Sequence, residues 1–456
     1  MTTAPGAGAP SHGSPIAAES GSPVSVESDA SHADVPSGAR PVRLSRALEA
    51  LYARVPLGMR LGLEAMRAAC MQAGHPERAF SSVHVAGTNG KGSTCAMVES
   101  IARAGGKKTG LYTSPHLCRF AERIRIDGEP ISDDVLAEVL ERALEIGPAL
   151  SFFETATLAA FLAFRDHAVD LAIIEVGIGG RLDATNVIPA ERLAVGAITR
   201  VALDHVDRLG NTLEAIAREK AGIAKRGRPL VLGPMSSEVR AAALEIALAE
   251  GALPIVMGED PDAVLRDGLD LGLRGTYQHD NARIAWRIGR ELGIPEAARR
   301  DGLARTTWPG RFEHIDVESG PLRGAWILDG AHNPDGARSL VLSLADDESK
   351  SAGRSAPAVI VFGALADKAW REMLDELACL PCPRIYVAPR GRAAADPSLL
   401  AAHAQGHVAS SLAEALALAR TLAPASSPVV ICGSLYLVGE ARARLLELPE
   451  DPPVAL

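Results

Sequence analysis

Residues 81–102, SSVHVAGTNGKGSTCAMVESIA, constrain the fold more than any other stretch of the chain. An apolar run leads into a glycine-rich turn with one lysine, Lys91, and the turn runs into a segment of helical composition. A strand, such a turn and a helix N-terminus together present backbone N–H groups to an anion, which predicts a phosphate-binding loop. The usual pattern G-x-x-x-x-G-K-[ST] is not met, since Gly87 lies too close to Gly90, and Gly92 stands where a hydroxyl is expected.

Short apolar runs alternate with helical segments along the chain, which favours a mostly parallel sheet covered by helices on both faces. A second series of runs follows Pro309-Gly310, a turn that is typical of a domain hinge. We expect an α/β fold of two domains: a phosphate-loop ATPase-like domain over 43–310 and a smaller Rossmann-like domain over 311–456. The expected strands are SVHVAG, KKTGLYTS, DLAIIEVG, LAVGAITRV and RPLVLG, then GAWILDG, APAVIVFGAL, PRIYVAP and PVVICGS.

Composition and charge argue against several other classes of protein. Residues 1–42 are rich in Ser, Pro, Ala and Gly and contain no aromatic residue, so we expect a disordered tail. The net charge of −9 provides no broad basic surface for nucleic acid, and no apolar run is long enough to cross a membrane. The N-terminus lacks the pattern of a secretory signal and the six cysteines are scattered, which indicates a cytoplasmic protein with reduced thiols.

Polar residues of the first series follow predicted strands. In DLAIIEVGIGGRLDATN, four apolar residues place Glu175 at a strand end, where a carboxylate can meet the metal ion of a nucleotide. Ser114 ends another predicted strand in YTSPHL, and His205 follows a third in ITRVALDHVDRLG. The residues alone leave His205 open between a structural histidine and a metal ligand, and they leave Lys220 as a solvated helix charge. GIGG lacks the third glycine of a dinucleotide fingerprint, so NAD is not favoured.

The second series repeats this arrangement. Asp329 ends the predicted strand in WILDGAHNPDG, and His332 lies in the polar turn after it. Ser434 ends a further strand in GSLYLVGEARARLL, just before a predicted helix. Open α/β sheets bind ligands outside the carboxyl ends of their strands, so we expect these positions to face a ligand. A carboxylate there can bind a ribose hydroxyl or an amine.

A series of motifs, in order from about residue 45 to residue 445, resembles the folylpolyglutamate synthase and dihydrofolate synthase family, which belongs to the Mur-ligase-like ATP-dependent amide ligases. In that family the phosphate loop is compressed in the same way, with glycine after the lysine and the hydroxyl displaced to Ser93. The motifs are GTNGKGST, YTSPHL, IRIDGEPI, FFETATLAAF, EVGIGGRLDATN, LDHVDRLGNTLEAIAREKAGI, QHDNARIA, WPGRFE, LDGAHNPDGA, FGALADK and GSLYLVGEAR.

The resemblance implies a role for each matching residue. Lys220 matches the lysine that family members carboxylate with carbon dioxide, which creates an anion that can hold a second metal ion. ATP and two magnesium ions would be bound. The triphosphate would lie against Gly90, Lys91, Gly92 and Ser93, and the rest of the nucleotide against Asn281, Arg311 and Asp329. The metal ligands would be Ser114, Glu175, His205 and Lys220. Lys91, Lys220, His205 and Arg311 would serve catalysis. Asp183 and Ser151 would line the pterin side, and His332 and Ser434 the glutamate pocket.

The implied reaction joins L-glutamate to dihydropteroate, to folyl (poly)glutamates or to both. A folate carboxylate attacks the γ-phosphorus of ATP, and the amine of glutamate then attacks the acyl phosphate, which releases phosphate. Family members that use dihydropteroate often carry an acidic residue where Arg60 stands in LYARVPLGMRLGLEAM, so the choice of acceptor stays open. We expect the enzyme to be a monomer.

Two alternatives are a different ligase of the same fold and a protein of another class. A Mur ligase that adds amino acids to a cell-wall precursor usually has an additional N-terminal substrate domain, and the polar segment before residue 43 is too short to form one. A nucleotide-binding regulator could hydrolyse ATP without ligating anything. Such a switch has no use for an amino-acid pocket, which the motifs DGAHNPDGA and GSLYLVGE indicate.

Overall fold

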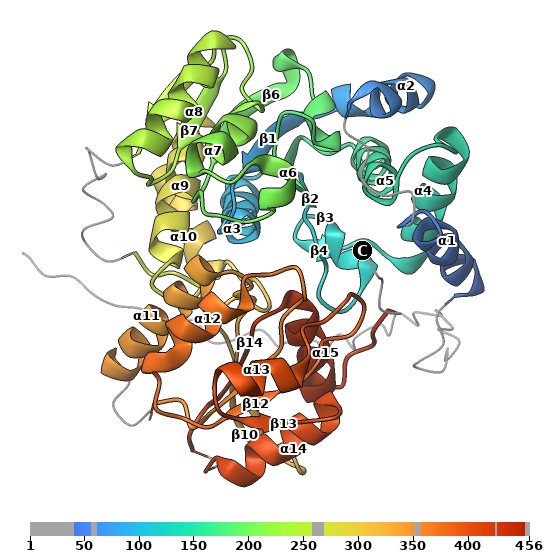
Figure 1. Ribbon diagram of the computed structural model, residues 1–456. Coiled ribbons are helices and arrows are strands. Elements are labelled where there is room, and N and C mark those ends of the chain that lie inside the picture. Colours follow the sequence, from blue (N-terminus) through green and yellow to red (C-terminus); the bar gives the residue numbers. More distant parts are fainter. Residues whose placement is uncertain (1–40, 56–61, 258–268, 351–355, 425, 452–456) are drawn as a thin grey trace, which may run out of the picture. The chain divides into compact units, whose positions relative to one another are not determined.

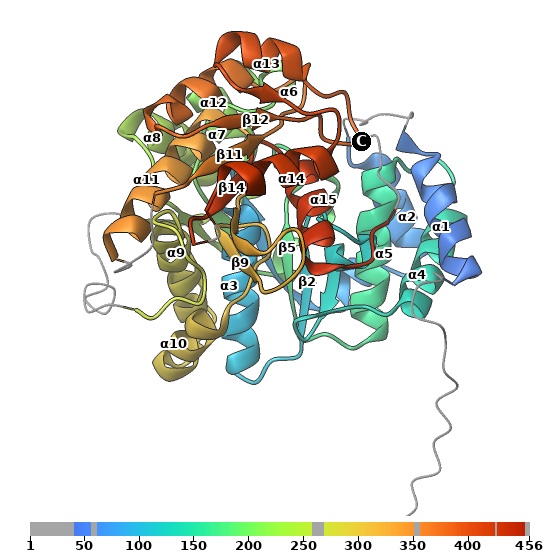
Figure 2. The same cartoon turned by 90° about the horizontal axis from the view of Figure 1, so that it is seen from below.

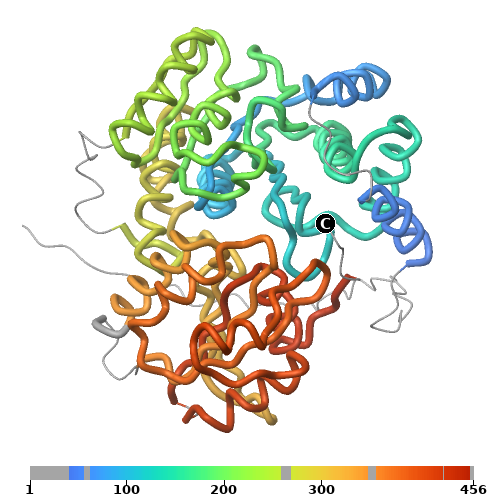
Figure 3. The backbone as a smooth tube through the Cα atoms, viewed as in Figure 1, coloured from blue at the N-terminus to red at the C-terminus, as the bar shows by residue number. Residues whose placement is uncertain are grey.

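The computed structural model describes residues 41–55, 62–257, 269–350, 356–424 and 426–451. Residues 1–40 of the predicted tail lie outside this part of the chain, and so does Arg60. Helix α1 begins at Val42, the last residue assigned to the tail from sequence. Figure 3 traces the described chain from blue through green to yellow in the first domain, and in orange and red through the second.

Two sheets organise the described residues, which confirms the predicted α/β architecture. The first has eight strands in the order β4-β3-β2-β5-β1-β6-β7-β8, and the second has six in the order β13-β12-β11-β14-β10-β9. The first sheet comprises β1 (Ser81–Ala86), β2 (Thr109–Tyr112), β3 (Ile124–Ile126), β4 (Glu129–Pro130), β5 (Leu171–Glu175), β6 (Leu193–Ile198), β7 (Pro229–Leu232) and β8 (Leu253–Val256). The second comprises β9 (Glu313–Val317), β10 (Gly324–Leu328), β11 (Val359–Phe362), β12 (Arg384–Tyr386), β13 (His407–Val408) and β14 (Val429–Cys432).

Most neighbouring strands run parallel, as the alternation of strands and helices predicts. The exceptions are strands that sequence reasoning missed: β3 runs antiparallel to β2 and β4, and β9 runs antiparallel to β10. These strands, and the missed β8 and β13, contain few buried residues, because they lie at or near a sheet edge. A half-exposed edge strand has no continuous apolar run to identify it.

Helices cover both faces of the first sheet (Figure 1). On one face, α3 (Lys91–Ala104) packs beside α9 (Gln278–Glu291) and α10 (Glu296–Arg305), over the buried side chains of Val83 and Val85. The same three helices lie together when the molecule is seen from below (Figure 2). This packing holds the N-terminus of α3 at the end of β1.

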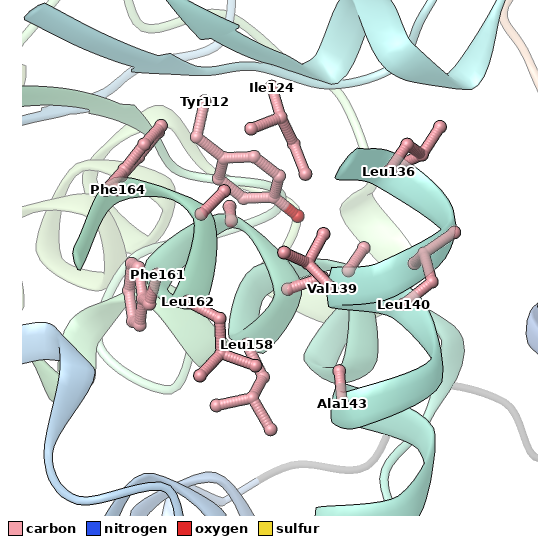
Figure 4. Close-up of a cluster of buried hydrophobic side chains, with 14 of the residues drawn as sticks. Tyr112, Ile124, Leu136, Val139, Leu140, Ala143, Leu158, Phe161, Leu162 and Phe164 are labelled. Atoms are coloured by element: carbon pink, nitrogen blue, oxygen red, sulfur yellow. The ribbon is translucent and has the colours of Figure 1, made fainter. Parts of the chain in front are cut away.

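The opposite face carries two groups of helices. Helices α7 (Leu213–Ala221) and α8 (Ser237–Ala249) pack over β6 and β7. Helix α5 (Phe152–Asp166) packs over β2 and β5, with α1 (Val42–Tyr52), α2 (Glu64–Gln72) and α4 (Asp133–Ile146) around it. Figure 4 shows part of this core, in which Tyr112 lies among aliphatic and aromatic side chains of α4 and α5, including Val139, Leu158, Phe161 and Phe164.

The second sheet is covered in the same manner. Helices α14 (Leu412–Leu422) and α15 (Leu435–Leu446) pack on one face. Helices α11 (Pro334–Lys350), α12 (Trp370–Glu376) and α13 (Pro397–His403) pack on the other. No helix in the described ranges is long and apolar enough to cross a membrane.

The strand order places a ligand site beside β1. Strands β5 and β2 extend the first sheet on one side of β1, and β6 and β7 extend it on the other. Such a reversal of strand order opens a crevice outside the carboxyl ends of the strands. The glycine-rich turn, Glu175 and the segment after β6 all lie at these ends.

Candidate active site

The glycine-rich turn forms a loop between β1 and α3, as predicted. Gly87 and Gly90 have φ angles of 154° and 87°, which favour glycine, and a Cβ atom at Gly90 would lie 2.2 Å from Oδ1 of Asn281. Lys91 is the first residue of α3, and its Nζ donates a hydrogen bond to the main-chain oxygen of Thr88 at 3.2 Å. The first N–H groups of a helix have no partner within the helix. The loop therefore fits an anion with several oxygens, such as a triphosphate.

Glu175 and Ser114 meet at the ends of neighbouring strands. Glu175 ends β5, and its Oε2 accepts a hydrogen bond from the main-chain nitrogen of Ser114, which follows β2, at 2.9 Å. The Glu175 residue is 4% exposed. Burial raises the pKa of Glu175, and the nearby charge of Lys91 opposes that rise. A carboxylate in this setting is stabilised by any further cation that the cavity admits.

His205 lies immediately before the short helix α6 (Val206–Leu209) and has a φ of 51°. Burial lowers the pKa of His205 to about 4, against the opposing charge of Asp204. The imidazole is therefore neutral near pH 7, and the neutral form is the one that ligates a metal ion.

Lys220 is not the solvated helix charge that the residues alone allowed. It is 3% exposed on α7, and its Nζ donates to the main-chain oxygen of Gly87, in the phosphate loop, at 2.8 Å. Burial lowers the pKa of Lys220 to about 7, and the positive charge of Lys91 adds to this effect. A substantial share of the amine is therefore uncharged near neutral pH.

The predicted metal ligands suit an ion that arrives with a nucleotide. Within the described residues, no three His, Cys, Asp or Glu side chains converge as a preformed metal site. Besides Lys220, which is expected to hold a metal ion only as a carbamate, the predicted set combines one carboxylate (Glu175), one imidazole (His205) and one hydroxyl (Ser114). Mg²⁺ usually takes one or two carboxylates and completes its shell with water and substrate phosphates. The side chains present therefore fit a magnesium ion whose other ligands come from ATP.

Ser93 and Asn281 lie together on two packed helices. Gln278 of α9 bridges them: its Nε2 donates to Oγ of Ser93 at 3.3 Å, and its Oε1 accepts from Nδ2 of Asn281 at 2.9 Å. Both Ser93 and Asn281 line the same cavity as the phosphate loop. The Ser93 hydroxyl, displaced by one position from the usual pattern, is thus next to the loop.

Asp329 ties the two domains together. Its carboxylate accepts hydrogen bonds from the Tyr277 hydroxyl at 2.6 Å and from the main-chain nitrogens of Phe312 and Ala331 at 3.0 and 2.8 Å. Tyr277 directly precedes α9 of the first domain. Burial raises the pKa of Asp329, and the Tyr277 hydroxyl and the charge of Arg311 oppose that rise. Asp329 and Arg311 both line the cavity.

His332 and Ser434, which are predicted to line the pocket for the substrate L-glutamate, line the cavity from the second domain. Nδ1 of His332 lies 2.8 Å from the main-chain oxygen of Gly330, with which it pairs. Ser434 caps α15, where its Oγ accepts from the main-chain nitrogen of Tyr436 at 3.2 Å. The Ser434 hydroxyl can still donate a hydrogen bond to a ligand.

Asp183 and Ser151 shape the wall of the cavity through local hydrogen bonds. Asp183 accepts from the main-chain nitrogens of Gly177 and Ile178 at 3.0 and 3.1 Å, and its other oxygen accepts from Thr185. Ser151 caps α5 in a reciprocal arrangement with the first turn of that helix. Both residues line the cavity, although their side-chain oxygens already bond to protein groups.

One cavity of about 550 Å³ contains all of these positions and is lined by both domains. The structure brings together every residue that the sequence predicted for the site, while their individual roles stay predictions. The residues are Gly90, Lys91, Gly92, Ser93, Ser114, Ser151, Glu175, Asp183, His205, Lys220, Asn281, Arg311, Asp329, His332 and Ser434.

Two family models match the chain: the Mur ligase middle domain over residues 85–232 and the Mur ligase, glutamate ligase domain over residues 310–435. The chain is 36% identical to the folylpolyglutamate synthase of Lacticaseibacillus casei over 409 residues, which is 82% of this chain and 92% of that protein. The chain belongs to the folylpolyglutamate synthase/dihydrofolate synthase family. It is also 35% identical to the family member of Escherichia coli K12, across 83% of this chain and 90% of that protein.

Solved structures of folylpolyglutamate synthase/dihydrofolate synthase enzymes share the fold. The E. coli enzyme in complex with DHPP and ADP has a TM-score of 0.76 and 32% identity, and the match covers 89% of this chain and 98% of that one. A bifunctional family enzyme with Mn, AMPPNP and L-glutamate bound has a TM-score of 0.74 and 31% identity, covering 90% of this chain and 100% of that one. The family and the two-domain α/β fold expected from sequence are thereby confirmed.

Sequence reasoning left Lys368 out of the site. Its Nζ lies 2.5 Å from Oδ1 of Asp204 in the first domain, and both side chains are 9% exposed. Oδ2 of Asp204 lies 3.5 Å from Nε2 of His332. Burial alone would raise the pKa of Asp204, but the hydrogen bond from His332 and the charge of Lys368 hold it well below its usual value. The motif FGALADK, which contains Lys368, was the only sequence signal for this contact.

Arg123 was missed as well. It is 2% exposed and lines the cavity beside Phe152 and Phe153 of α5. In the sequence it lies between two apolar stretches, in FAERIRI, where an arginine ordinarily reads as a surface charge. Only the pairing of β2 with β3 shows that Arg123 stands beside Thr113 and therefore near Ser114.

Proposed function

We propose that this chain joins L-glutamate to a folate acceptor through an acyl phosphate formed from ATP. Its family consists of ATP-dependent ligases that join glutamate to folates. The observation that supports the mechanism best is the single cavity described above. It is lined by the phosphate loop, by the predicted metal ligands and by second-domain residues suited to an amino acid.

The first half-reaction uses the first domain. The triphosphate lies along the loop from Gly90 to Ser93. The carboxylate of the acceptor attacks the γ-phosphorus, the bond to the β,γ-bridging oxygen breaks, and ADP leaves. Lys91 and Arg311 stabilise the negative charge that spreads over the transferring phosphoryl group. Ser114, Glu175 and His205 would hold a magnesium ion, which would supply further positive charge at the phosphate oxygens when bound.

The second half-reaction uses groups from both domains. His332 and Ser434 hold L-glutamate so that its uncharged amine faces the acyl carbon. The amine forms the C–N bond, phosphate leaves with the former carboxylate oxygen, and the amine loses its extra proton to water or buffer. The cavity between the domains limits the access of water, which would otherwise hydrolyse the acyl phosphate.

We also propose that Lys220 is carboxylated. The uncharged amine attacks carbon dioxide, the new N–C bond forms, and one proton is released to give a carbamate. Burial at 3% exposure beside Lys91 disfavours the ammonium form and so supplies the reactive amine. A carbamate replaces a repelled cation with an anion, which suits a site that holds metal ions.

Either folate acceptor is compatible with the relatives reported above. One is named for the polyglutamate activity alone and the other for both activities, and their identities to this chain are 36% and 35%. The deciding experiment supplies ATP, magnesium and glutamate with dihydropteroate, with tetrahydrofolate or with no acceptor, and weighs the products. One glutamyl residue added to dihydropteroate establishes the synthase activity, and addition to tetrahydrofolate alone establishes a polyglutamylating enzyme.

The same experiment separates the alternatives. ADP release that needs no acceptor would favour a non-ligating ATPase over the ligase. A cell-wall ligase is disfavoured, because the curated relatives compared above are named as folate ligases. We further propose a monomeric enzyme, since one chain supplies residues from both domains to the cavity. Size-exclusion chromatography with light scattering tests this.

A further inference from the structure

Arg123 is a buried cation that forms no ion pair with any described carboxylate, although the charge of Glu175 acts on it across the cavity. Its Nε donates a hydrogen bond to Nδ1 of His116 at 2.8 Å, and its Nη2 has no hydrogen-bond partner among the described residues. The guanidinium carbon lies 5.2 Å and 5.3 Å from the ring centroids of Phe120 and Phe152. A buried charge is unfavourable unless it is paired, so an uncompensated one beside a ligand cavity points to a partner that the protein does not provide.

The neighbouring titratable groups do not supply that partner. Burial, and after it the charge of Arg123, lower the pKa of His116, so its imidazole is neutral and only accepts the hydrogen bond. The adjacent carboxylate, Glu122, is occupied by the main-chain nitrogens of Leu117, Cys118 and Arg119 at 2.8, 3.0 and 2.9 Å. The Glu122 carboxylate thus stabilises the turn before it and does not form an ion pair with Arg123.

The position of Arg123 relates it to the acyl-transfer centre. Its main-chain oxygen accepts from the nitrogen of Thr113 at 3.0 Å, and the next residue, Ser114, donates to Glu175 at 2.9 Å. Arg123 lines the cavity together with Phe153 of α5 and Tyr436 of the second domain. The guanidinium therefore lies beside the predicted metal ligands, on the side where the apolar wall of α5 suits an aromatic acceptor.

We infer that Arg123 binds the α-carboxylate of the terminal glutamyl residue of a folyl acceptor. The inference rests on the proposed function and deepens it. A folylglutamate ends in two carboxylates separated by a short methylene chain: the γ-carboxylate reacts, and the α-carboxylate remains as an anion close to the reacting atoms. A guanidinium matches a carboxylate through two parallel N–H groups. Dihydropteroate has only the carboxylate that reacts, so Arg123 favours folylglutamates over pteroates.

Two acceptors that differ in this one group test the inference. Tetrahydrofolate has the α-carboxylate, whereas tetrahydropteroyl-4-aminobutyrate keeps the reactive carboxylate at the same spacing and lacks the other. Titration calorimetry gives the dissociation constant of each acceptor with wild-type protein and with Arg123→Met. Wild type is expected to bind tetrahydrofolate on the order of 10²-fold more tightly than the analogue, as for other buried charge pairs. In Arg123→Met the two constants become equal, and the constant of the analogue changes little.

Arg125→Met is the matched control. Arg125 lies in strand β3, two residues after Arg123, and its guanidinium stacks on Trp308 with the carbon 5.1 Å from the ring centroid. Arg125 does not line the cavity. This variant is expected to keep the wild-type preference for tetrahydrofolate. Loss of the preference in Arg125→Met would assign it to general changes in β3 and overturn the role of Arg123.

Further results of the binding experiment would also overturn the role of Arg123. Equal binding of the two acceptors by wild type overturns the inference and needs no variant, so the test stands even if Arg123→Met fails to fold. An equal loss of affinity for both acceptors in Arg123→Met overturns it too, because Arg123 would then act on a part that the acceptors share. Mass spectrometry of wild-type reactions separates the two levels: glutamate added to neither tetrahydrofolate nor dihydropteroate overturns the proposed function itself.

Discussion

Nζ of Lys220 donates a hydrogen bond to the main-chain oxygen of Gly87 at 2.8 Å. The contact joins α7 to the phosphate loop and places the amine of a buried lysine beside Lys91. Two neighbouring ammonium groups repel each other, and burial strengthens the repulsion. Conversion of one of them into an anion removes this repulsion and adds a ligand for a metal ion.

Replacement of Lys220 by arginine is expected to abolish ligation, because a guanidinium keeps the positive charge and cannot form the carbamate. Wild-type enzyme is expected to lose activity in buffers stripped of carbon dioxide and to regain it with bicarbonate, whereas Lys220→Arg stays inactive. Initial rates of ADP release in the two buffers measure this. Lys225→Arg is the control, since the one hydrogen bond of Lys225 to the described residues goes to the main-chain oxygen of Asn186. Substantial ligation by Lys220→Arg would refute the carbamate.

Removal of the Lys91 ammonium by Lys91→Ala is expected to lower kcat by about 10²–10³-fold, the scale for the loss of one charge-stabilising donor. The reason is that Lys91 is the first residue of α3 and its Nζ lies within the phosphate loop. Lys107→Ala, at an exposed position after the same helix, is expected to leave kcat unchanged. Steady-state ADP release measures both variants, and near-normal turnover of Lys91→Ala would show that the loop does not hold the triphosphate.

The ion pair between Asp204 and Lys368 joins the domains at 2.5 Å, with both side chains 9% exposed. Loss of one member leaves a buried charge unpaired, so Lys368→Met and Asp204→Asn are each expected to reduce kcat/KM for glutamate on the order of 10²-fold. The double variant is expected to lose less than the product of the two single losses. A double-mutant cycle on kcat/KM measures this coupling. Fully multiplicative losses would mean that the two residues act independently.

The stability of the first domain is expected to fall in acid because of His84. This histidine is fully buried in β1, its Nε2 lies 2.7 Å from Oγ1 of Thr185, and burial lowers its pKa to about 3 from a usual 6.5. At pH values between these two pKa values, His84 therefore binds a proton in the unfolded chain but not in the folded chain. The stabilisation is fully present above pH 6.5 and is lost as the pH falls toward 3.

His84→Gln is expected to flatten this dependence, because glutamine can also bond to Thr185 and does not titrate. Urea unfolding at several pH values between about 4 and 7, the range in which histidine titrates, gives the free energies of unfolding of the two proteins. The exposed His407→Gln is expected to keep the wild-type slope. An equally steep slope in His84→Gln would assign the acid sensitivity to other groups.

Much of the architecture could be predicted because its central strands carry a strong local signal. β1, β5 and β6 are buried along nearly their whole length. β5 is apolar up to its terminal Glu175 and β6 contains no polar side chain, whereas β1 contains buried polar residues and is marked by the glycines of the phosphate loop after it. The weak signals belong to edges: β13 consists of two exposed residues and β4 of two more. Their pairing depends on neighbours that are distant in the sequence.

The site could be predicted where a motif matched a family, and not where a tertiary contact decides. Lys220 belongs to the charged sequence AREKAGI, yet it is buried because the loop at Gly180 packs against α7; a Cβ atom there would lie 2.8 Å from the oxygen of Lys220. Lys368 acquires its role only through Asp204 of the other domain. Arg123 acquires its position from the pairing of β3 with β2.

The most direct test of the central claim weighs the folate product formed by the purified enzyme. The enzyme is given ATP, magnesium and L-glutamate, with tetrahydrofolate and, separately, with dihydropteroate. The account predicts that at least one acceptor gains a glutamyl residue, with one ADP and one phosphate released for each amide formed. Steady ADP release with both acceptors unchanged in mass would contradict it.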